Sequence, residues 1–106
     1  MVLNVPPTNA LQNAYNTLLS FDKTQDTYLK KNIGATYAKL NYKAFVKLTI
    51  ACLVTVQPIS TNACTMVITA NQVGGVDPGI AVMAQTHEFA AEFLRRFSET
   101  LEKPNS

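Results

Sequence analysis

The clearest signal in the chain is a two-residue alternation of apolar and polar side chains over positions 44–57. Successive side chains of a β-strand point to opposite faces of a sheet, so this alternation predicts a strand whose even-numbered side chains face the core. Turn-forming residues follow from Pro58 to Asn62, and a second alternating stretch runs from Ala63 to Val73. The two stretches therefore predict a β-hairpin. The apolar even positions of its first strand are Ala44, Val46, Leu48, Ile50, Cys52, Val54 and Val56.

Two other stretches have the three-to-four-residue spacing of amphipathic helices. The first runs from Thr8 to Phe21, where Thr8 or Asn9 can cap its beginning. The second starts at Asp77-Pro78 and continues to Lys103, before Pro104. At ~1.5 Å per residue this helix would be about 40 Å long, which is long for so small a domain. An irregular start with a shorter helix capped by Thr86 is therefore an alternative.

The order of elements predicts an α+β fold. A short extended segment precedes Pro6, and β-forming residues are frequent from Ile33 onward. We expect an antiparallel sheet of three to four strands, in the order β-α-β-β-β-α, packed on one face by two helices of which the C-terminal one is long. The polar stretch from Asp22 to Asn32 is interpreted as a helical turn or a loop. Residues 1–106 are predicted to form a single domain.

Composition narrows the class of protein. The chain has 106 residues, 47% hydrophobic and 15% charged, which excludes a disordered chain. Its formal net charge of +2 is weaker than expected of a dedicated nucleic-acid binder. No apolar stretch is long enough to cross a bilayer, and no signal peptide precedes Pro6. We expect a cytoplasmic protein; a periplasmic or secreted one is the alternative if a leader was removed, and Met1 would then not be native.

The odd-numbered face of the hairpin is only half polar. A sheet face in contact with water is expected to be more polar than this. Our first hypothesis is that a second copy of the chain or another protein covers this face, so that the domain binds and does not catalyse. Alternatively, a curled sheet under the C-terminal helix encloses a small apolar ligand, or the face has no functional meaning. The candidate interaction residues are Phe45, Ala51, Leu53, Val67 and Val73.

A lysine-rich segment from Tyr28 to Lys47 suggests a second function. It contains no acidic residue and interleaves lysines with Tyr28, Tyr37, Tyr42 and Phe45. Ammonium groups beside aromatic rings suit a polyanion such as nucleic acid, or an anionic membrane surface. Solvated strands and sheet edges also carry lysines, and the segment has no arginine for bidentate phosphate contacts. The candidate anion-binding residues are Lys30, Lys31, Lys39, Lys43 and Lys47.

Candidates for catalysis or metal binding are few. His87 is the only histidine and lies on the apolar stripe of the last helix. Cys52 and Cys64 are predicted to be core thiols: a hairpin centred on Pro58 would place them opposite each other, whereas one centred on Ser60 would keep them too far apart for a disulfide. A nucleophilic Cys64–His87 pair is disfavoured, because a catalytic thiol needs an exposed setting. The glycine-rich stretch 74–79 lacks a phosphate-loop pattern. We expect no enzyme activity, metal or cofactor.

Overall fold

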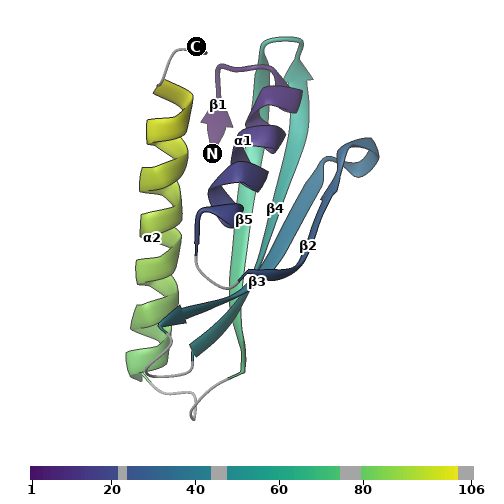
Figure 1. Cartoon of the computed structure of the whole chain (residues 1–106). Helices are drawn as coiled ribbons and strands as arrows, with labels where there is room; N and C mark the ends of the chain where they lie inside the picture. Colours follow the sequence, from purple (N-terminus) through teal and green to yellow (C-terminus); the bar gives the residue numbers. More distant parts are fainter. Residues whose placement is uncertain (22–23, 44–47, 75–79, 103–106) are drawn as a thin grey trace.

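The fold is an antiparallel sheet whose strands lie in the order β1-β5-β4-β3-β2, with two helices (Figure 1). The structure is a computed structural model that describes residues 1–21, 24–43, 48–74 and 80–102; side chains at 42–48, 74–85 and 102 lie outside the description. The elements are β1 (Val2–Leu3), α1 (Pro7–Leu19), β2 (Gln25–Lys30), the 3-10 helix η1 (Lys31–Ile33), β3 (Ala35–Lys43), β4 (Leu48–Ser60), β5 (Ala63–Gly74) and α2 (Ile80–Glu102).

The predicted α+β class is confirmed, but the sheet has five strands and not three to four. The additional strand is β2, in the stretch interpreted as a turn or loop. It pairs with β3 at the sheet edge, and only Tyr28 and Leu29 among its residues are large and apolar. An edge strand needs little apolar surface because one side of it borders solvent. Its positive φ of 53° at Asp26 and a register shift after Gln25 also obscure the two-residue period.

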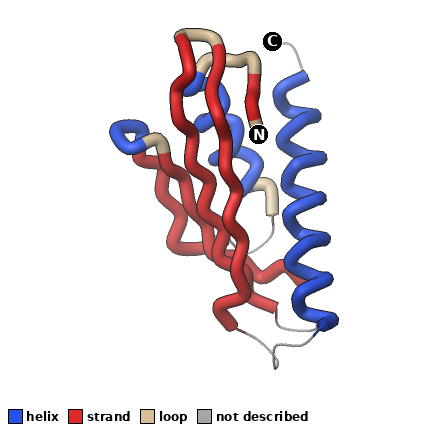
Figure 2. Tube along the Cα trace, turned by 180° about the vertical axis from the view of Figure 1, so that it is seen from behind, coloured by secondary structure: helices blue, strands red, loops and turns tan. Residues whose placement is uncertain are grey.

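The even-numbered side chains of β4 face the core, as predicted. Ile50, Cys52 and Val54 are completely buried and Val56 nearly so. Both helices cover this face: α1 contacts β3 and β4, and α2 contacts α1 and β5. Seen from behind in Figure 2, the strands lie in front of α1. Three phenylalanines of α2 complete the core, with rings 6.1–6.5 Å from centroid to centroid along the helix: Phe89, Phe93 and Phe97.

The β4–β5 hairpin is confirmed, with a tighter turn than the Pro58–Asn62 stretch predicted. Ser60 pairs with Ala63, and Pro58 remains within β4 opposite Cys64. Proline is tolerated here because β4 has already lost its neighbour on the other side: the last bond to that side runs from the Val56 N–H to the Gly34 carbonyl, at 2.8 Å. Beyond that point a missing N–H breaks no ladder bond.

The C-terminal helix is the long one and not the shorter alternative. It contains 23 residues from Ile80 onward, so Thr86 lies inside it and does not cap it. At ~1.5 Å per residue it is about 35 Å long, and the 43 Å long dimension of the molecule accommodates it. The predicted start at Asp77-Pro78 lies outside the described residues. The cap predicted for α1 is wrong, because α1 starts at Pro7 after Pro6 with no side-chain cap.

Arg96 of α2 contacts the residues that follow the end of α1. Its Nη1 donates to the carbonyl oxygen of Ser20 at 3.1 Å, and its guanidinium lies 4.0 Å from the ring centroid of Phe21. Its Nε donates to Glu92 at 2.6 Å. With Arg95 also donating to it, the pKa of Glu92 falls to about 2. The Arg96 side chain therefore connects α2 to the end of α1 by a hydrogen bond and a cation–π contact.

Candidate interaction face

The face of the sheet opposite the helices brings together residues from four strands. We call it the outer face; it is formed by Tyr28, Lys30, Tyr37, Lys39, Ala51, Leu53, Thr55, Val67, Thr69, Asn71 and Val73. The register sets their positions: Tyr28 pairs with Tyr37, and Tyr37 pairs with Leu53. Side chains opposite each other on neighbouring strands are in contact distance. An apolar row therefore crosses the sheet from β2 to β4.

The two tyrosines in this row stack on each other. Their ring centroids are 5.3 Å apart and their planes differ by 12°. The Nζ of Lys30 lies 4.8 Å from the centroid of the Tyr28 ring. Each tyrosine is half-buried. The Tyr28 ring therefore stacks on the Tyr37 ring and also contacts the ammonium group of Lys30.

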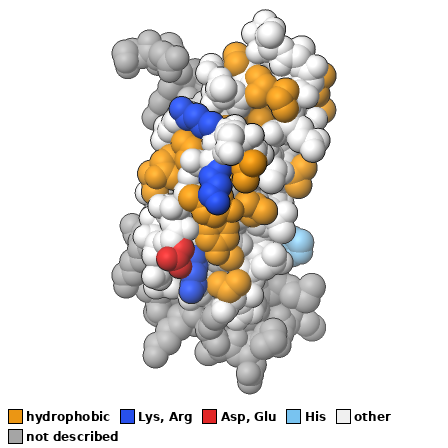
Figure 3. Space-filling view, turned by 90° about the vertical axis from the view of Figure 1, so that its right-hand side faces the viewer, with side chains coloured by type: hydrophobic (Ala, Val, Ile, Leu, Met, Phe, Trp, Pro, Cys, Tyr) orange, Lys and Arg blue, Asp and Glu red, His pale blue; other side chains and the backbone are white. Residues whose placement is uncertain are grey.

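The predicted interaction residues differ in exposure. Val67 and Val73 are 52% and 53% exposed, whereas Ala51 and Leu53 are half-buried. Phe45 lies outside the described residues. Figure 3, viewed from the side on which β2 lies in Figure 1, shows hydrophobic side chains with lysines between and beside them. Within the described ranges, both helices lie on the opposite face, so this apolar surface has no cover from them.

The structure places the predicted anion-binding lysines in two locations. Lys30 and Lys39 belong to the outer face, on either side of the tyrosine row: Lys30 pairs with Ala35, and Lys39 with Ala51. Lys31 instead lies in η1, away from that row. The side chain of Lys43 and the whole of Lys47 lie outside the description. Sequence reasoning treated the lysine segment and the half-apolar face as separate leads, and it missed that Tyr28 and Tyr37 join them.

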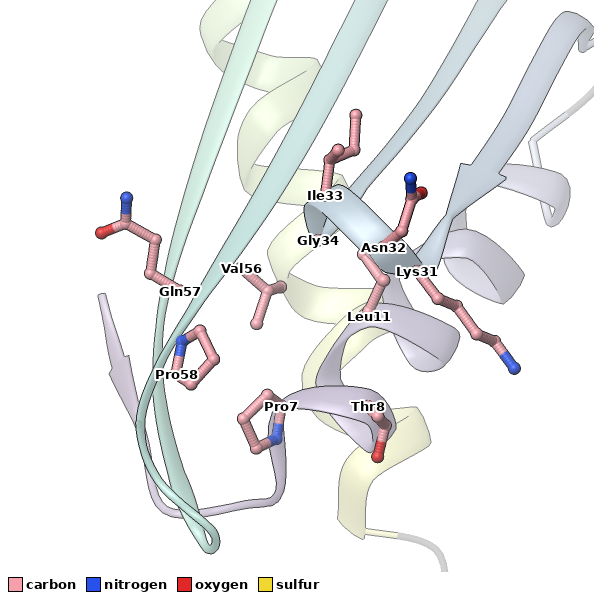
Figure 4. Close-up of a pocket in the computed structure, with 10 residues that line it drawn as sticks. All are labelled: Pro7, Thr8, Leu11, Lys31, Asn32, Ile33, Gly34, Val56, Gln57 and Pro58. Atoms are coloured by element: carbon pink, nitrogen blue, oxygen red, sulfur yellow. The ribbon is translucent and has the colours of Figure 1, made fainter.

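A cleft of about 350 Å³ lies between the first turn of α1, η1 and the end of β4. Figure 4 shows Pro7, Leu11, Val56 and Pro58 around it, while the side chains of Lys31 and Gln57 extend away. Binding pockets usually combine apolar walls with a few polar groups that converge on the ligand. Convergent polar groups are not seen in this cleft. It also lies beside α1 and not under α2, where the ligand hypothesis placed the cavity.

The two cysteines are free and buried. Cys64 pairs with Pro58 and Cys52 with Ala70, so they lie six residues apart along the hairpin, about 20 Å at ~3.3 Å per residue. Burial raises the pKa of the Cys52 thiol to about 12 and also raises that of Cys64. Both thiols therefore stay protonated at neutral pH and act as small apolar side chains.

His87 and Cys64 are not brought together. His87 is exposed, whereas Cys64 is completely buried. His87 is in the first half of α2, which begins near the Gly74 end of β5 (Figure 1). Cys64 lies at the opposite end of β5. The arrangement expected of a thiol–imidazole pair, with the two groups within hydrogen-bond distance, is not formed.

Outside the outer face, the described residues form no metal cluster and no membrane-spanning helix. In the part of the chain that the structure describes, no three His, Cys, Asp or Glu side chains are grouped to hold a metal ion. None of the described helices is both long and apolar enough to span a bilayer. No protein-family model matches the chain, and no curated protein matches it.

Proposed function

We propose that this chain is a non-catalytic interaction domain that self-associates through the outer face. The observation that carries the proposal is the apolar row Tyr28–Tyr37–Leu53, which crosses three strands on the side away from both helices. Val67 continues the apolar surface on β5 with half of its side chain exposed. Burial of apolar surface is the main driving force of association between proteins.

A second copy of the chain suits this surface. Sheets pack face to face about 10 Å apart when both inner faces are apolar, and a two-fold dimer uses the same patch on both subunits. Tyrosine is enriched in such interfaces, since its ring is apolar and its hydroxyl can remain hydrated at the edge. Lys30 and Lys39 can cover apolar surface with their stems while the ammonium groups reach water.

Sedimentation equilibrium over micromolar concentrations tests the proposal. We expect a monomer–dimer equilibrium in the wild-type chain and its loss in Leu53→Lys, which places a charge in the middle of the row. Leu19→Lys is the matched control, because Leu19 is 43% exposed on α1, away from the outer face. A strict monomer at all concentrations, or equal effects of the two variants, would overturn the proposal.

A second candidate function is binding of single-stranded nucleic acid, favoured by the position of Lys30 and Lys39 on the two sides of the tyrosine row. It ranks second because one face of the Tyr28 ring is stacked on Tyr37 and Lys30 lies over the same ring. Stacked bases need free ring faces. Salt separates the two functions: nucleic-acid binding weakens as salt rises, whereas apolar self-association between lysine-bearing faces strengthens.

A further inference from the structure

The outer edge of β5 is paired only at its beginning. β1 contributes two register pairs, Val2 with Thr65 and Leu3 with Cys64, and the backbones of Met1 and Met66 bond to each other at 2.8 and 3.0 Å. β5 then continues to Gly74. Within the described ranges, no strand lies beside residues 67–73 on this side of β5. This stretch of seven residues is about 23 Å long at ~3.3 Å per residue.

The direction of the backbone groups along this edge follows from the bonds of Met66. Both its N–H and its carbonyl point toward Met1, and hence away from β4. Backbone groups of alternate residues in a strand point the same way. Ile68 and Ala70 therefore direct their N–H and carbonyl groups outward, while Val67, Thr69 and Asn71 direct theirs to β4. The side chains of Ile68 and Ala70 are also only partly covered, in contrast to the fully buried core residues of β4.

Over residues 67–72, this edge carries none of the features that usually prevent strand addition. Exposed edges are typically protected by lysine, proline, a bulge or a short strand. The 12 residues of β5 include no charged residue and no proline. The register shifts of the β4–β5 ladder lie at its two ends. One is near Ser60; at the other, Thr49 pairs with Gly74 and Ile50 with Gln72, so Val73 is an extra residue of β5 just beyond this stretch. The opposite edge, β2, is protected: it has six residues, Asp26 and Lys30, and a register shift with a positive φ at Asp26.

We infer that the β5 edge binds an extended, uncharged segment of a partner protein by strand addition. An extended backbone can bond in succession to the outward N–H and carbonyl groups of both Ile68 and Ala70. The nearest side chains select its chemistry. On the outer face a new strand would lie beside Val67, which is 52% exposed, and Thr69, which is also exposed; on the other face it would lie beside Ile68 and Ala70. Both sides favour neutral, β-branched residues.

A second copy of the chain is the less favourable occupant of this edge. α2 runs along β5 in both views (Figures 1 and 2) and contacts it. A two-fold axis beside β5 would bring the second α2 against the first. A partner segment without a helix beside it meets no such obstacle, as β1 shows at the beginning of the same edge.

Amide hydrogen exchange on the full chain tests the inference. The probe is a synthetic peptide of seven alternating threonine and valine residues between terminal lysines, and the control is the same peptide with N-methyl groups on the amides that would face β5. We expect the Ile68 and Ala70 amides to exchange rapidly in the free chain, and the probe to slow them about ten-fold or more. The N-methylated peptide should have no effect.

A protein variant provides the matching test. Ala70→Pro removes an N–H that points away from β4, so the β4–β5 ladder is retained and proline is tolerated. We expect this variant to lose the effect of the probe at Ile68, whereas Ala70→Val, which keeps the N–H, should retain it. If Ala70→Pro fails to fold, the comparison of the two peptides on the wild-type chain still tests the inference.

Three results would overturn the inference. The first is protection of Ile68 and Ala70 in the free chain at every dilution, which would mean that the edge is covered from within. The second is protection that rises with protein concentration alone, which would make a second copy the occupant. The third is equal binding of the two peptides. Leu53→Lys should leave the probe's effect unchanged, so failure of the outer-face proposal is distinguishable from failure of this one.

Discussion

The two faces of β4 are both rich in apolar side chains, yet they differ in what covers them. The even-numbered residues Ile50, Cys52 and Val54 are completely buried under the helices. The odd-numbered residues Ala51 and Leu53 point away from both helices, as far as the described residues show, and remain half-buried. The two-residue period therefore identifies the two faces. The helices, which come from either end of the chain, decide which of them becomes the core.

Apolar content alone does not distinguish a core face from an interface face. Burial under a helix contributes to folding of a single chain, whereas an apolar face without a helix contributes only when another molecule covers it. Substitutions on the inner face should therefore change stability, and those on the outer face should change association.

The strongest contrast is expected between Phe93→Ala and Leu53→Ala. Phe93 is completely buried between Phe89 and Phe97, so its truncation should lower the free energy of unfolding by about 3–5 kcal/mol. Leu53 is half-buried, and its truncation should cost about 1 kcal/mol. Urea unfolding, measured at a concentration at which the chain is monomeric, gives both values. Equal losses would contradict the assignment of the two faces.

Cys52 provides a pH test of the inner face. Its pKa rises from an ordinary 9.0 to about 12 on folding because burial disfavours the thiolate. Below pH 9 the thiol is protonated in both states and its contribution is complete; as pH rises further, the unfolded chain loses the proton first. Stability should therefore fall by about 2 kcal/mol at about pH 10.5, since each pKa unit corresponds to about 1.4 kcal/mol.

The measurement compares thermal unfolding of the wild-type chain and Cys52→Val at about pH 8 and about pH 10.5. The difference between the two proteins removes the contributions of tyrosines and lysines, which both share. We expect the wild type to lose more stability than the variant. Parallel losses would show that the Cys52 thiol is accessible to solvent.

A smaller effect is expected at Gly34, which ends η1 in the connection between β2 and β3. Its φ is +62°, and a Cβ there would lie 2.5 Å from the Val56 carbonyl oxygen. Gly34→Ala should lower the free energy of unfolding by about 1–2 kcal/mol. Gly34→Asn separates the two causes, because asparagine tolerates positive φ but brings the same Cβ. Equal losses in the two variants would assign the cost to the close contact, and a smaller loss for Asn to the backbone angle.

The sequence alone predicts the inner face well and the outer face only in part. Alternation at Ile50, Cys52 and Val54 identifies core strands because full burial imposes a strict period. It does not reveal β2, whose edge position tolerates polar residues such as Gln25 and Asp26. The long helix was predicted, but its continuity through Thr86 depends on a molecule elongated to 43 Å, which no local pattern encodes.

The candidate site shows the same limit. Tyr28, Tyr37 and Leu53 form one row only because two strand registers align them across 25 positions of the chain. Each residue is unremarkable in its own segment. Had β2 been identified, the alternation of Tyr28 and Lys30 against Leu29 would have been the signal that places the lysine segment on the outer face.

The smallest predicted effect concerns a lysine of the outer face. Lys39 lies beside Ala51, adjacent to the tyrosine row. In a dimer formed through this face, its charge opposes that of the other copy, so Lys39→Gln should strengthen self-association by a few tenths of a kcal/mol at low salt, as expected for an exposed charge pair. High salt should reduce the difference, because it screens the repulsion in the wild type. Lys31→Gln, in η1 away from the row, is the control and should have no effect. Sedimentation equilibrium at low and high salt measures the change in the dimerisation constant.

If Lys39→Gln weakens association instead, the lysine must meet an acidic or polyanionic surface. The outer face would then be a docking surface for a partner of opposite charge and not for a second copy.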